Sequence, residues 1–350
     1  MLNGYQIIDA DSHTIEPISL WQQYLNPRFQ HFAPSPDLTI KGEEIYYKIS
    51  DRVKSKMSLV NNFDAESQVK AIKDMGIDRS IIYPSFGLWL LSIDTMTPQL
   101  AQEFVLAYNN WLRDFCSYNP QILIGVGLVN LHNPDDLVPE LNRILKFGWK
   151  AVCLLPNPVK GRLLNHVAYE PFWAECERQN IAVGLHTVAH SRLPTTGADR
   201  FDTHFSMHAC AHPMEQMMAL LALIEGGVLE RYPKLKVGFL ESGCGWLPYW
   251  LWRLDKEYEE LYWEVKDNVK MKPSEYFRRQ CFIEIEPSEP YLSEIIASIG
   301  ENNLIFGSDY PHLDRDPDVV KKAVALDRQL STESVRKILW DNSVRFYGIE

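Results

Sequence analysis

Short runs of apolar residues recur along the chain, and longer segments with helical spacing of apolar positions separate them. The apolar runs lie at 6–13, 79–83, 122–129, 151–155, 181–186, 236–241, 281–285 and 304–307. The helical segments lie at 65–75, 98–117, 135–146, 170–178, 213–231, 245–263, 291–298, 317–326 and 332–339. Eight strands alternating with helices predict an α/β fold, a single (β/α)₈ TIM-type barrel.

One segment breaks this rhythm, because residues 18–75 separate the first strand from the second. SLWQQYL has helical spacing, PSPD is a turn, and LTIKGEEIYYKI predicts a hairpin about Lys41–Gly42. We therefore expect an insertion after strand one that acts as a lid or pocket wall within a single domain, 1–350. A doubly wound open sheet is the alternative fold, but no GxGxxG follows the first strand to support it.

The first strand ends in ionisable residues, in the run QIIDADSHTIEP. Alternate residues of a strand share a face, so Asp9, Asp11 and His13 project to one side. An Asp-x-His pair at the end of a buried strand offers a carboxylate oxygen beside an imidazole nitrogen. Such a pair suits Zn²⁺, Fe²⁺ or Mn²⁺.

Other strands end in the same kind of residue: His186 on the fifth, Glu241 on the sixth and Asp309 just past the eighth. In a TIM barrel the carboxyl ends of the strands meet at the catalytic face. We therefore predict a divalent metal held by Asp11, His13, His186 and Asp309, although each of these residues alone is also typical of a core, turn or capping position.

Composition and charge argue against several classes of function and partner. The formal charge of −11, with no basic stretch to offset it, argues against nucleic acid or an anionic membrane as partner. The six cysteines are scattered without a CxxC pair, as buried free thiols are. Neither a signal peptide nor an apolar run of roughly 18 residues is present, so we expect a cytoplasmic protein.

Four motifs resemble those of the amidohydrolase-2 family, which includes the aminocarboxymuconate-semialdehyde and γ-resorcylate decarboxylases. They are IDADSHTIEP, GLH at 184–186, RYPKLKVGFLESGCGW at 231–246 and LIFGSDYPH at 304–312. The resemblance implies a metal-binding barrel and carries ligand roles onto Asp11, His13, His186 and Asp309. It implies either hydrolysis or nonoxidative decarboxylation, because the family contains both kinds of enzyme.

Two positions bear on that choice. Relatives that are decarboxylases carry a histidine at the end of strand six, whereas this chain has Glu241 in ESG. The superfamily's carboxylated lysine on strand four is not expected, because that strand ends in Leu154, Leu155 and Pro156. The missing histidine favours a hydrolase over a decarboxylase, and the missing lysine favours a single metal over a lysine-bridged pair.

Between strands five and six the chain is rich in histidine, with residues at 186, 190, 204, 208 and 212. The spacing of the last three places them on one helical face. His208 is a candidate acid or base, although histidines that only cap the helix and line the pocket explain the spacing better. The run Trp246, Tyr249, Trp250 and Trp252 is typical of core or a subunit interface, and otherwise of a grip on an aromatic substrate.

These observations predict a metal-dependent hydrolase of an amide, ester or thioester bond in a small organic substrate, with Asp309 or Glu241 moving the proton. The alternative is a nonoxidative decarboxylase of an aromatic or unsaturated carboxylic acid. A barrel that binds a small ligand without turnover is the second alternative. One metal ion is expected, and a second held by Glu16 and Glu241 is the other option. We expect a homodimer.

Overall fold

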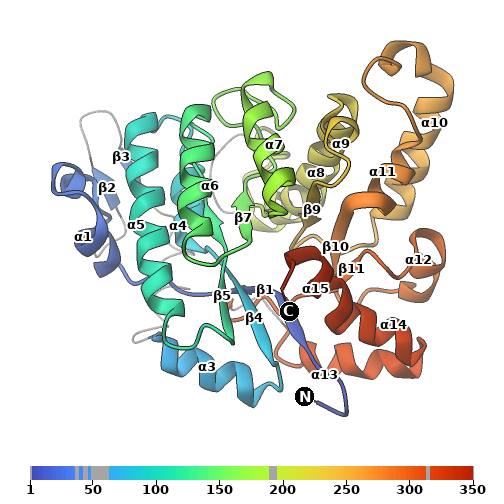
Figure 1. Ribbon diagram of the computed structural model, residues 1–350, viewed down its shortest axis with the longest axis horizontal. Coiled ribbons are helices and arrows are strands. Elements are labelled where there is room, and N and C mark those ends of the chain that lie inside the picture. The colour runs from blue at the N-terminus through green and yellow to red at the C-terminus, as the bar shows by residue number, and fades with distance from the viewer. Residues whose placement is uncertain are drawn as a thin grey trace.

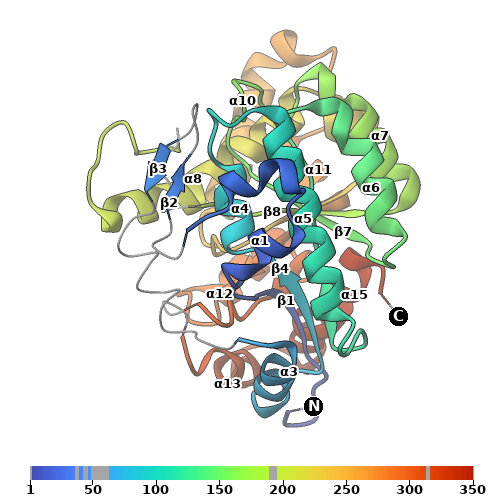
Figure 2. The same ribbon diagram turned by 90° about the vertical axis from the view of Figure 1, so that its left-hand side faces the viewer.

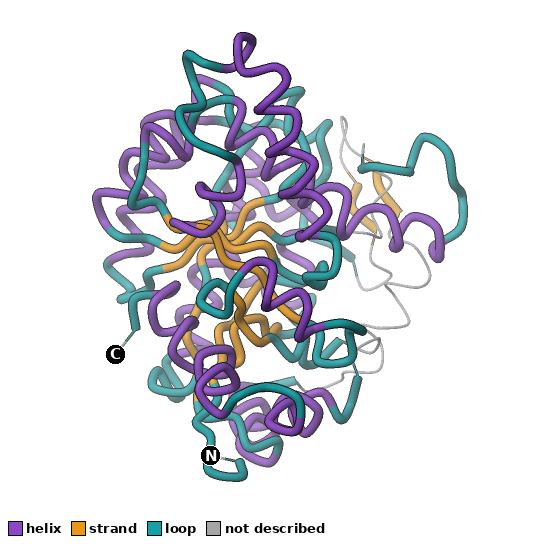
Figure 3. Tube along the Cα trace, turned by 90° about the vertical axis from the view of Figure 1, so that its right-hand side faces the viewer, coloured by secondary structure: helices purple, strands orange, loops and turns teal. Residues whose placement is uncertain are grey.

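The computed structural model describes residues 2–35, 39–41, 46–48, 63–188, 195–312 and 316–349. Its centre is a ring of short parallel strands with helices around it (Figure 3). The strands are β1 (Ile8–His13), β4 (Arg79–Tyr83), β5 (Leu123–Gly125), β6 (Gly127–Leu128), β7 (Ala151–Leu154), β8 (Ala182–Leu185), β9 (Lys236–Phe239), β10 (Cys281–Ile285) and β11 (Leu304–Phe306).

Each strand pairs in parallel with its neighbour in the order β1-β4-β5 and β6-β7-β8-β9-β10-β11. β5 and β6 form one predicted strand interrupted at Val126, whose N–H donates to the Ile82 carbonyl at 3.0 Å. The ring closes between β11 and β1, where the Asp309 N–H donates to the Asp11 carbonyl at 2.9 Å. With β5 and β6 counted as one, the described part of the chain has the eight strand positions of the predicted barrel.

Helices cover the outside of the ring (Figure 1). They are α3 (Ala65–Asp74), α4 (Phe86–Leu91), α5 (Pro98–Cys116), α6 (Leu137–Leu145), α7 (Glu170–Gln179), α8 (His204–Glu225), α9 (Val228–Arg231), α10 (Leu247–Val265), α11 (Pro273–Gln280), α12 (Leu292–Ile299), α13 (Val319–Val324), α14 (Thr332–Arg336) and α15 (Asn342–Tyr347). No helix among the described residues has both the length and the apolar character to cross a membrane.

The helix after strand five is longer than predicted at its amino end. We expected it to start at Pro213, but α8 begins at His204, because the Thr203 side chain accepts from the Ser206 N–H and caps it there. Pro213 therefore lies inside α8 rather than at its first turn. Two helices that the pattern did not predict, α4 and α11, are one to two turns long, too short for a clear apolar period.

The segment 18–75 contains several elements in its described parts, including α1 (Ser19–Tyr24), β2 (Thr39–Lys41) and β3 (Tyr46–Lys48). β2 and β3 pair antiparallel, as the hairpin prediction requires, although its turn lies outside the described residues. Trp21 of α1 packs edge-on against Phe86 and Phe104, and α1 lies beside α5 (Figure 2). The last helix of the segment, α3, leads directly into β4, so it is the ordinary connecting helix of the barrel rather than part of an insertion.

Aromatic residues of α15 close the base of the barrel. Phe346 and Tyr347 are buried, and Phe346 packs on Phe282 of β10 with ring centroids 4.8 Å apart. The Tyr347 hydroxyl donates to the Ala10 carbonyl at 2.6 Å and contacts the Tyr83 hydroxyl at 2.9 Å. The end of the chain therefore plugs the face opposite the carboxyl ends of the strands. All six cysteines are free and five of them are buried, as expected.

Candidate metal centre

The three acidic and imidazole side chains of β1 divide between two tasks. Asp9 accepts from both the N–H and the hydroxyl of Ser308, at 2.8 and 2.5 Å, so it ties β1 to the end of β11. Burial raises the pKa of Asp9 to about 7. The β1–β4 register shifts between Asp9 and Ser12. Asp11, within this shift, and His13, just after it, turn to the centre of the ring. Both are fully buried.

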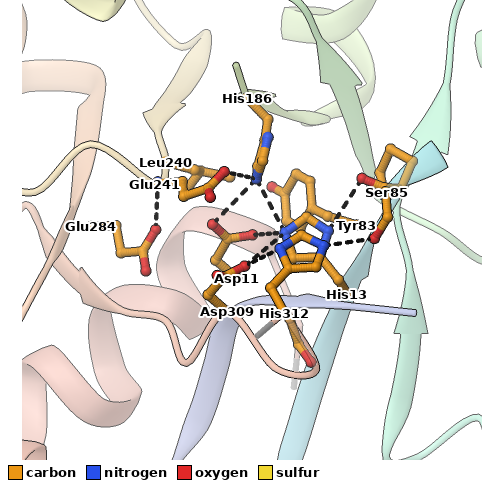
Figure 4. A network of polar contacts seen from close by, with 12 residues as sticks. Asp11, His13, Tyr83, Ser85, His186, Leu240, Glu241, Glu284, Asp309 and His312 are labelled. Atoms are coloured by element: carbon orange, nitrogen blue, oxygen red, sulfur yellow. Dashed lines mark hydrogen bonds and ion pairs between the residues drawn. The ribbon is translucent and has the colours of Figure 1, made fainter. Parts of the chain in front are cut away.

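The four predicted ligands come together there (Figure 4). The Nε2 atoms of His13 and His186 lie 3.1 Å apart. His13 Nε2 lies 3.5 Å from an oxygen of Asp11 and 3.5 Å from Asp309 Oδ1. His186 Nε2 lies 3.7 Å from the other Asp11 oxygen.

Backbone carbonyl groups fix which nitrogen each imidazole turns to the centre. His13 Nδ1 contacts the Pro84 carbonyl at 3.2 Å, and His186 Nδ1 contacts the Thr187 carbonyl at 3.0 Å. A carbonyl oxygen only accepts, so Nδ1 carries the hydrogen and Nε2 presents a lone pair. Burial lowers the pKa of His13 well below its usual value and that of His186 to about 3, so both rings are neutral.

Asp11 shows that the centre fits a cation. Neither of its oxygens accepts from an N–H or hydroxyl group among the described residues, and both are buried. Burial, followed by the neighbouring carboxyl groups of Glu284, Asp309 and Glu241, raises its pKa well above the usual range. Two neutral imidazole lone pairs facing crowded carboxylates form a donor set that a divalent ion satisfies.

Glu241 stands just past β9 in a left-handed backbone conformation, with φ of 50°. Its N–H donates to Glu284 at 2.7 Å, and its carbonyl accepts from His212 Nδ1 at 2.7 Å. Its carboxylate lies 3.1 Å from His186 Nε2. Glu241 therefore lies at the edge of the predicted ligands, where the sequence pattern placed it.

Glu16 has a different environment from the one we predicted for a second metal ligand. Its two oxygens accept from the backbone N–H groups of Ser85, Phe86 and Gly87, at 2.9 to 3.0 Å. These N–H groups lie at the start of α4, where backbone N–H groups have no hydrogen-bond acceptor within the helix. Glu16 caps a helix, and it is absent from the described residue groups that present close ligand atoms.

Of the histidines at 190, 204, 208 and 212, the structure shows His212 in contact with residues beside the centre. His190 and the His204 side chain lie outside the described residues. His208 and His212 stack on α8 with centroids 4.2 Å apart. Buried His212, rather than His208, contacts the Glu241 carbonyl and, at 3.2 Å, the Thr187 hydroxyl.

Three residues of the centre were not predicted. Glu284 of β10 is buried, and burial raises its pKa to about 8; a glutamate inside the apolar run CFIEI was the available signal. His312 contacts Asp309, and Ser85 contacts His312. Nothing in the sequence marks Ser85, because its role depends on loops from separate strands.

A cavity of about 310 Å³ opens beside this centre at the carboxyl ends of β9 to β11. Its walls carry more acidic than basic groups. The lining includes His208, His212, Glu241, Glu284, Glu286, Asp309, Asp316 and Lys322. All three proton-transfer candidates from the sequence, Glu241, Asp309 and His208, face this space.

Comparison with known proteins gives matches along most of the chain. The model of an amidohydrolase family matches residues 8–349. The 2-amino-3-carboxymuconate-6-semialdehyde decarboxylase of Dictyostelium discoideum is 24% identical over 294 residues, 83% of this chain and 78% of the relative. The gamma-resorcylate decarboxylase of Polaromonas sp. (strain JS666 / ATCC BAA-500) is 23% identical, covering 71% of this chain and 77% of its own.

Solved structures share the fold. An amidohydrolase from Mycobacterium avium subsp. paratuberculosis K-10 has a TM-score of 0.82 at 21% identity, covering 99% of this chain and all of that one. The 5-carboxyvanillate decarboxylase of Novosphingobium aromaticivorans DSM 12444, complexed with manganese and 4-hydroxy-3-methoxy-5-nitrobenzoic acid, has a TM-score of 0.74 at 20% identity, with 99% and 97% coverage. The α/β barrel prediction is confirmed, whereas an insertion after strand one is not shown.

These findings correct the predicted activity. The hydrolase reading depended on the histidine missing at Glu241, but the homologues named here are decarboxylases. The hydrolase prediction is wrong and its alternative, decarboxylation, is the better supported one. A single replaced side chain does not decide the reaction when other groups line the same cavity. The match of the family model over nearly the whole length shows that the chain belongs to the amidohydrolase-2 family.

Proposed function

We propose that this protein is a metal-dependent, nonoxidative decarboxylase of a small aromatic or unsaturated carboxylic acid. The observation that carries the proposal is the pair of imidazole Nε2 atoms facing each other at 3.1 Å beside the fully buried carboxylate of Asp11. This centre lies at the end of the barrel that bears catalytic groups in such folds. The names of the homologues supply the reaction class.

Asp11, His13, His186 and Asp309 would hold one divalent ion. Zinc, iron and manganese all suit two imidazoles and two carboxylates, and the manganese of the structural neighbour favours the last. When bound, such an ion is a Lewis acid that anchors a substrate carboxylate and polarises it. Four protein ligands leave coordination positions for substrate oxygens.

The residues of the chain account for the rest of the reaction. Decarboxylation adds one proton to the carbon that loses the carboxylate, and the electron pair of the broken C–C bond forms the new C–H bond. Glu241, Asp309 and His208 line the cavity and are the proton-transfer groups that we propose.

The cavity bears on the substrate. About 310 Å³ accommodates one substituted benzene ring or a short unsaturated chain, and excludes a polymer. Acidic side chains line this space, so a substrate with hydroxyl or amino donors beside its carboxylate would find acceptors there.

A second copy of the chain is the proposed partner. Phe205, Met214 and Met218 of α8 and Tyr249 and Trp252 of α10 are exposed, from 43% to 83% of each residue. Large exposed apolar side chains gathered on two packed helices are typical of a subunit interface. Sedimentation at two protein concentrations tests the homodimer, and a monomer at micromolar concentration contradicts it.

Metal-loaded protein and a panel of hydroxybenzoates, unsaturated acids, amides and esters test the function. We expect CO₂ from at least one acid and no cleavage of the amides or esters. His186→Ala should lose activity and metal together. His166→Ala should keep both, because it changes an exposed histidine whose recorded hydrogen bond is to the Ala168 N–H and which is not one of the proposed ligands. If the protein binds metal but turns over no acid in the panel, the result would favour the alternative of a barrel that binds a small ligand without turnover.

A further inference from the structure

The loop after β11 turns back on itself beside the metal centre. Asp309 has a left-handed backbone conformation, with φ of 53°. The His312 N–H donates to the Asp309 carbonyl at 2.9 Å and closes the turn. This turn brings the His312 side chain back to the carboxylate that begins it.

His312 makes three contacts there (Figure 4). Its Nδ1 lies 2.6 Å from Asp309 Oδ1, and its Nε2 lies 2.9 Å from the Ser85 hydroxyl. Its ring stacks on His13, with centroids 4.1 Å apart and planes at 26°. The imidazole is therefore fixed at both nitrogens and on one face.

The direction of these hydrogen bonds follows from Ser85. A serine hydroxyl has one hydrogen, and Ser85 donates it to the Thr14 carbonyl at 2.9 Å. His312 Nε2 must then donate to Ser85. The other ring nitrogen, Nδ1, faces Asp309 Oδ1 at a distance of 2.6 Å.

We propose that His312 is a positioning residue, which holds one oxygen of Asp309 and is itself anchored by Ser85. The proposal rests on the metal site of the proposed function. A carboxylate bound at one oxygen cannot rotate freely, so Asp309 presents its lone pairs to the centre in one orientation. Ligands that are oriented before the ion binds lose less conformational freedom on binding.

The anchor is secure because three loops meet in it. Ser85 follows β4, Thr14 follows β1, and His312 follows β11. The Ser85 N–H donates to the helix-capping carboxylate of Glu16 at 3.0 Å, so its backbone is also fixed. A shift of any one loop would strain the other two.

Two near-isosteric substitutions separate the contacts. His312→Asn places an amide nitrogen near the position of Nδ1, so it keeps a donor for Asp309 and loses Ser85. His312→Gln places an amide nitrogen near the position of Nε2, so it keeps Ser85 and loses Asp309. Ser85→Ala removes the anchor on Nε2 together with the hydrogen bond to the Thr14 carbonyl, and it leaves the His312 side chain unchanged. His166→Gln is the control for replacing a histidine elsewhere.

The measurement is the dissociation constant of Mn²⁺, by chelator competition on metal-free protein, with kcat and KM measured separately and Tm checked. We expect a 10- to 100-fold weaker constant in His312→Gln, with kcat falling more than KM rises. Ser85→Ala should weaken it about 3- to 10-fold and His312→Asn by less than about threefold. The control should match wild type.

Wild-type Mn²⁺ affinity and kcat in folded His312→Gln would overturn the proposal. So would an equal loss in His312→Asn and His312→Gln, because the contact to Asp309 would then not matter. If His312→Gln fails to fold, wild-type affinity in Ser85→Ala overturns it. Wild-type protein that binds Mn²⁺ but releases no CO₂ refutes the proposed function alone, since the affinity series still decides the role of His312.

Discussion

At the scale of residues, the two histidines of the centre owe their properties to burial and to one backbone carbonyl partner each. His13 and His186 are neutral because they are buried, and backbone carbonyls decide which nitrogen faces inward. Strand alternation alone predicts Asp11 and His13. It cannot predict Ser85 or His312, which meet only because loops from different strands converge.

Glu241 decides how many ions the centre holds. Its carboxylate lies 3.1 Å from His186 Nε2, close enough to join the ligands or to serve as an acid. For Glu241→Gln we expect about one metal per chain, as in wild type, and a fall in kcat of at least about 100-fold, because the amide cannot give up a proton. Metal analysis and steady-state kinetics provide the two numbers. Near two metals in wild type and one in the variant would show that Glu241 is a ligand.

His132 lies away from the centre and gives the protein a predictable acid sensitivity. Burial, with Lys160 and Arg162 nearby, lowers the pKa of His132, and its Nε2 contacts the Ile93 carbonyl at 3.1 Å. The unfolded state takes up a proton below pH of about 6.5 and the folded state does not, so stability falls as pH drops.

We therefore expect wild type to lose about 1 kcal/mol more than His132→Gln between pH 7.5 and 5.5, measured by urea unfolding. Glutamine keeps a donor for the Ile93 carbonyl, so the comparison isolates the charge. Parallel losses in the two proteins would contradict the assignment of a depressed pKa.

At the scale of elements, strands are well predicted because each is a short apolar run with polar residues at its end. The helices are less regular. Pro213 suggested a helix start, but α8 begins nine residues earlier, at His204, where Thr203 caps it. The first residue of α4, Phe86, donates its N–H to the carboxylate of Glu16. Capping by a residue 70 positions away leaves no local pattern in the sequence.

The role of segment 18–75 as a pocket wall stays a prediction, and it now concerns only the residues before α3. Trp21 packs against α4, which starts at the carboxyl end of β4. Replacing residues 36–62 by a short Gly-Ser linker should raise KM for the acid at least about fivefold and leave metal per chain unchanged. An unchanged KM across the substrate panel would remove this segment from the pocket.

At the scale of the whole molecule, chemistry and stability occupy opposite ends of one barrel. The metal centre lies at the carboxyl ends of the strands, and α15 plugs the other end with Phe346 and Tyr347. The closed ring of strands was predictable from eight apolar runs. The plug formed by Phe346 and Tyr347 was not predictable, because these residues contact β10 and β1, which are distant from them in the sequence.

Phe346→Ala tests that separation. Removing a fully buried ring that packs on Phe282 should lower the free energy of unfolding by about 3–5 kcal/mol. Metal per chain and KM at 25 °C should stay at the wild-type values, because the ring of Phe346 packs on Phe282 and Tyr347 rather than on a proposed metal ligand. A loss of metal from protein that remains folded would show that the two ends are coupled.

The central claim is that this metal centre removes CO₂ from an acid and puts a proton on the carbon left behind. Carboxyl-¹³C substrate in D₂O, followed by NMR with metal-loaded and metal-free protein, measures this directly. We predict one ¹³CO₂ released for each deuteron bound to the vacated carbon, and neither without metal. A carboxylate retained while the protein cleaves an ester or amide, in a metal-dependent way, would contradict the account.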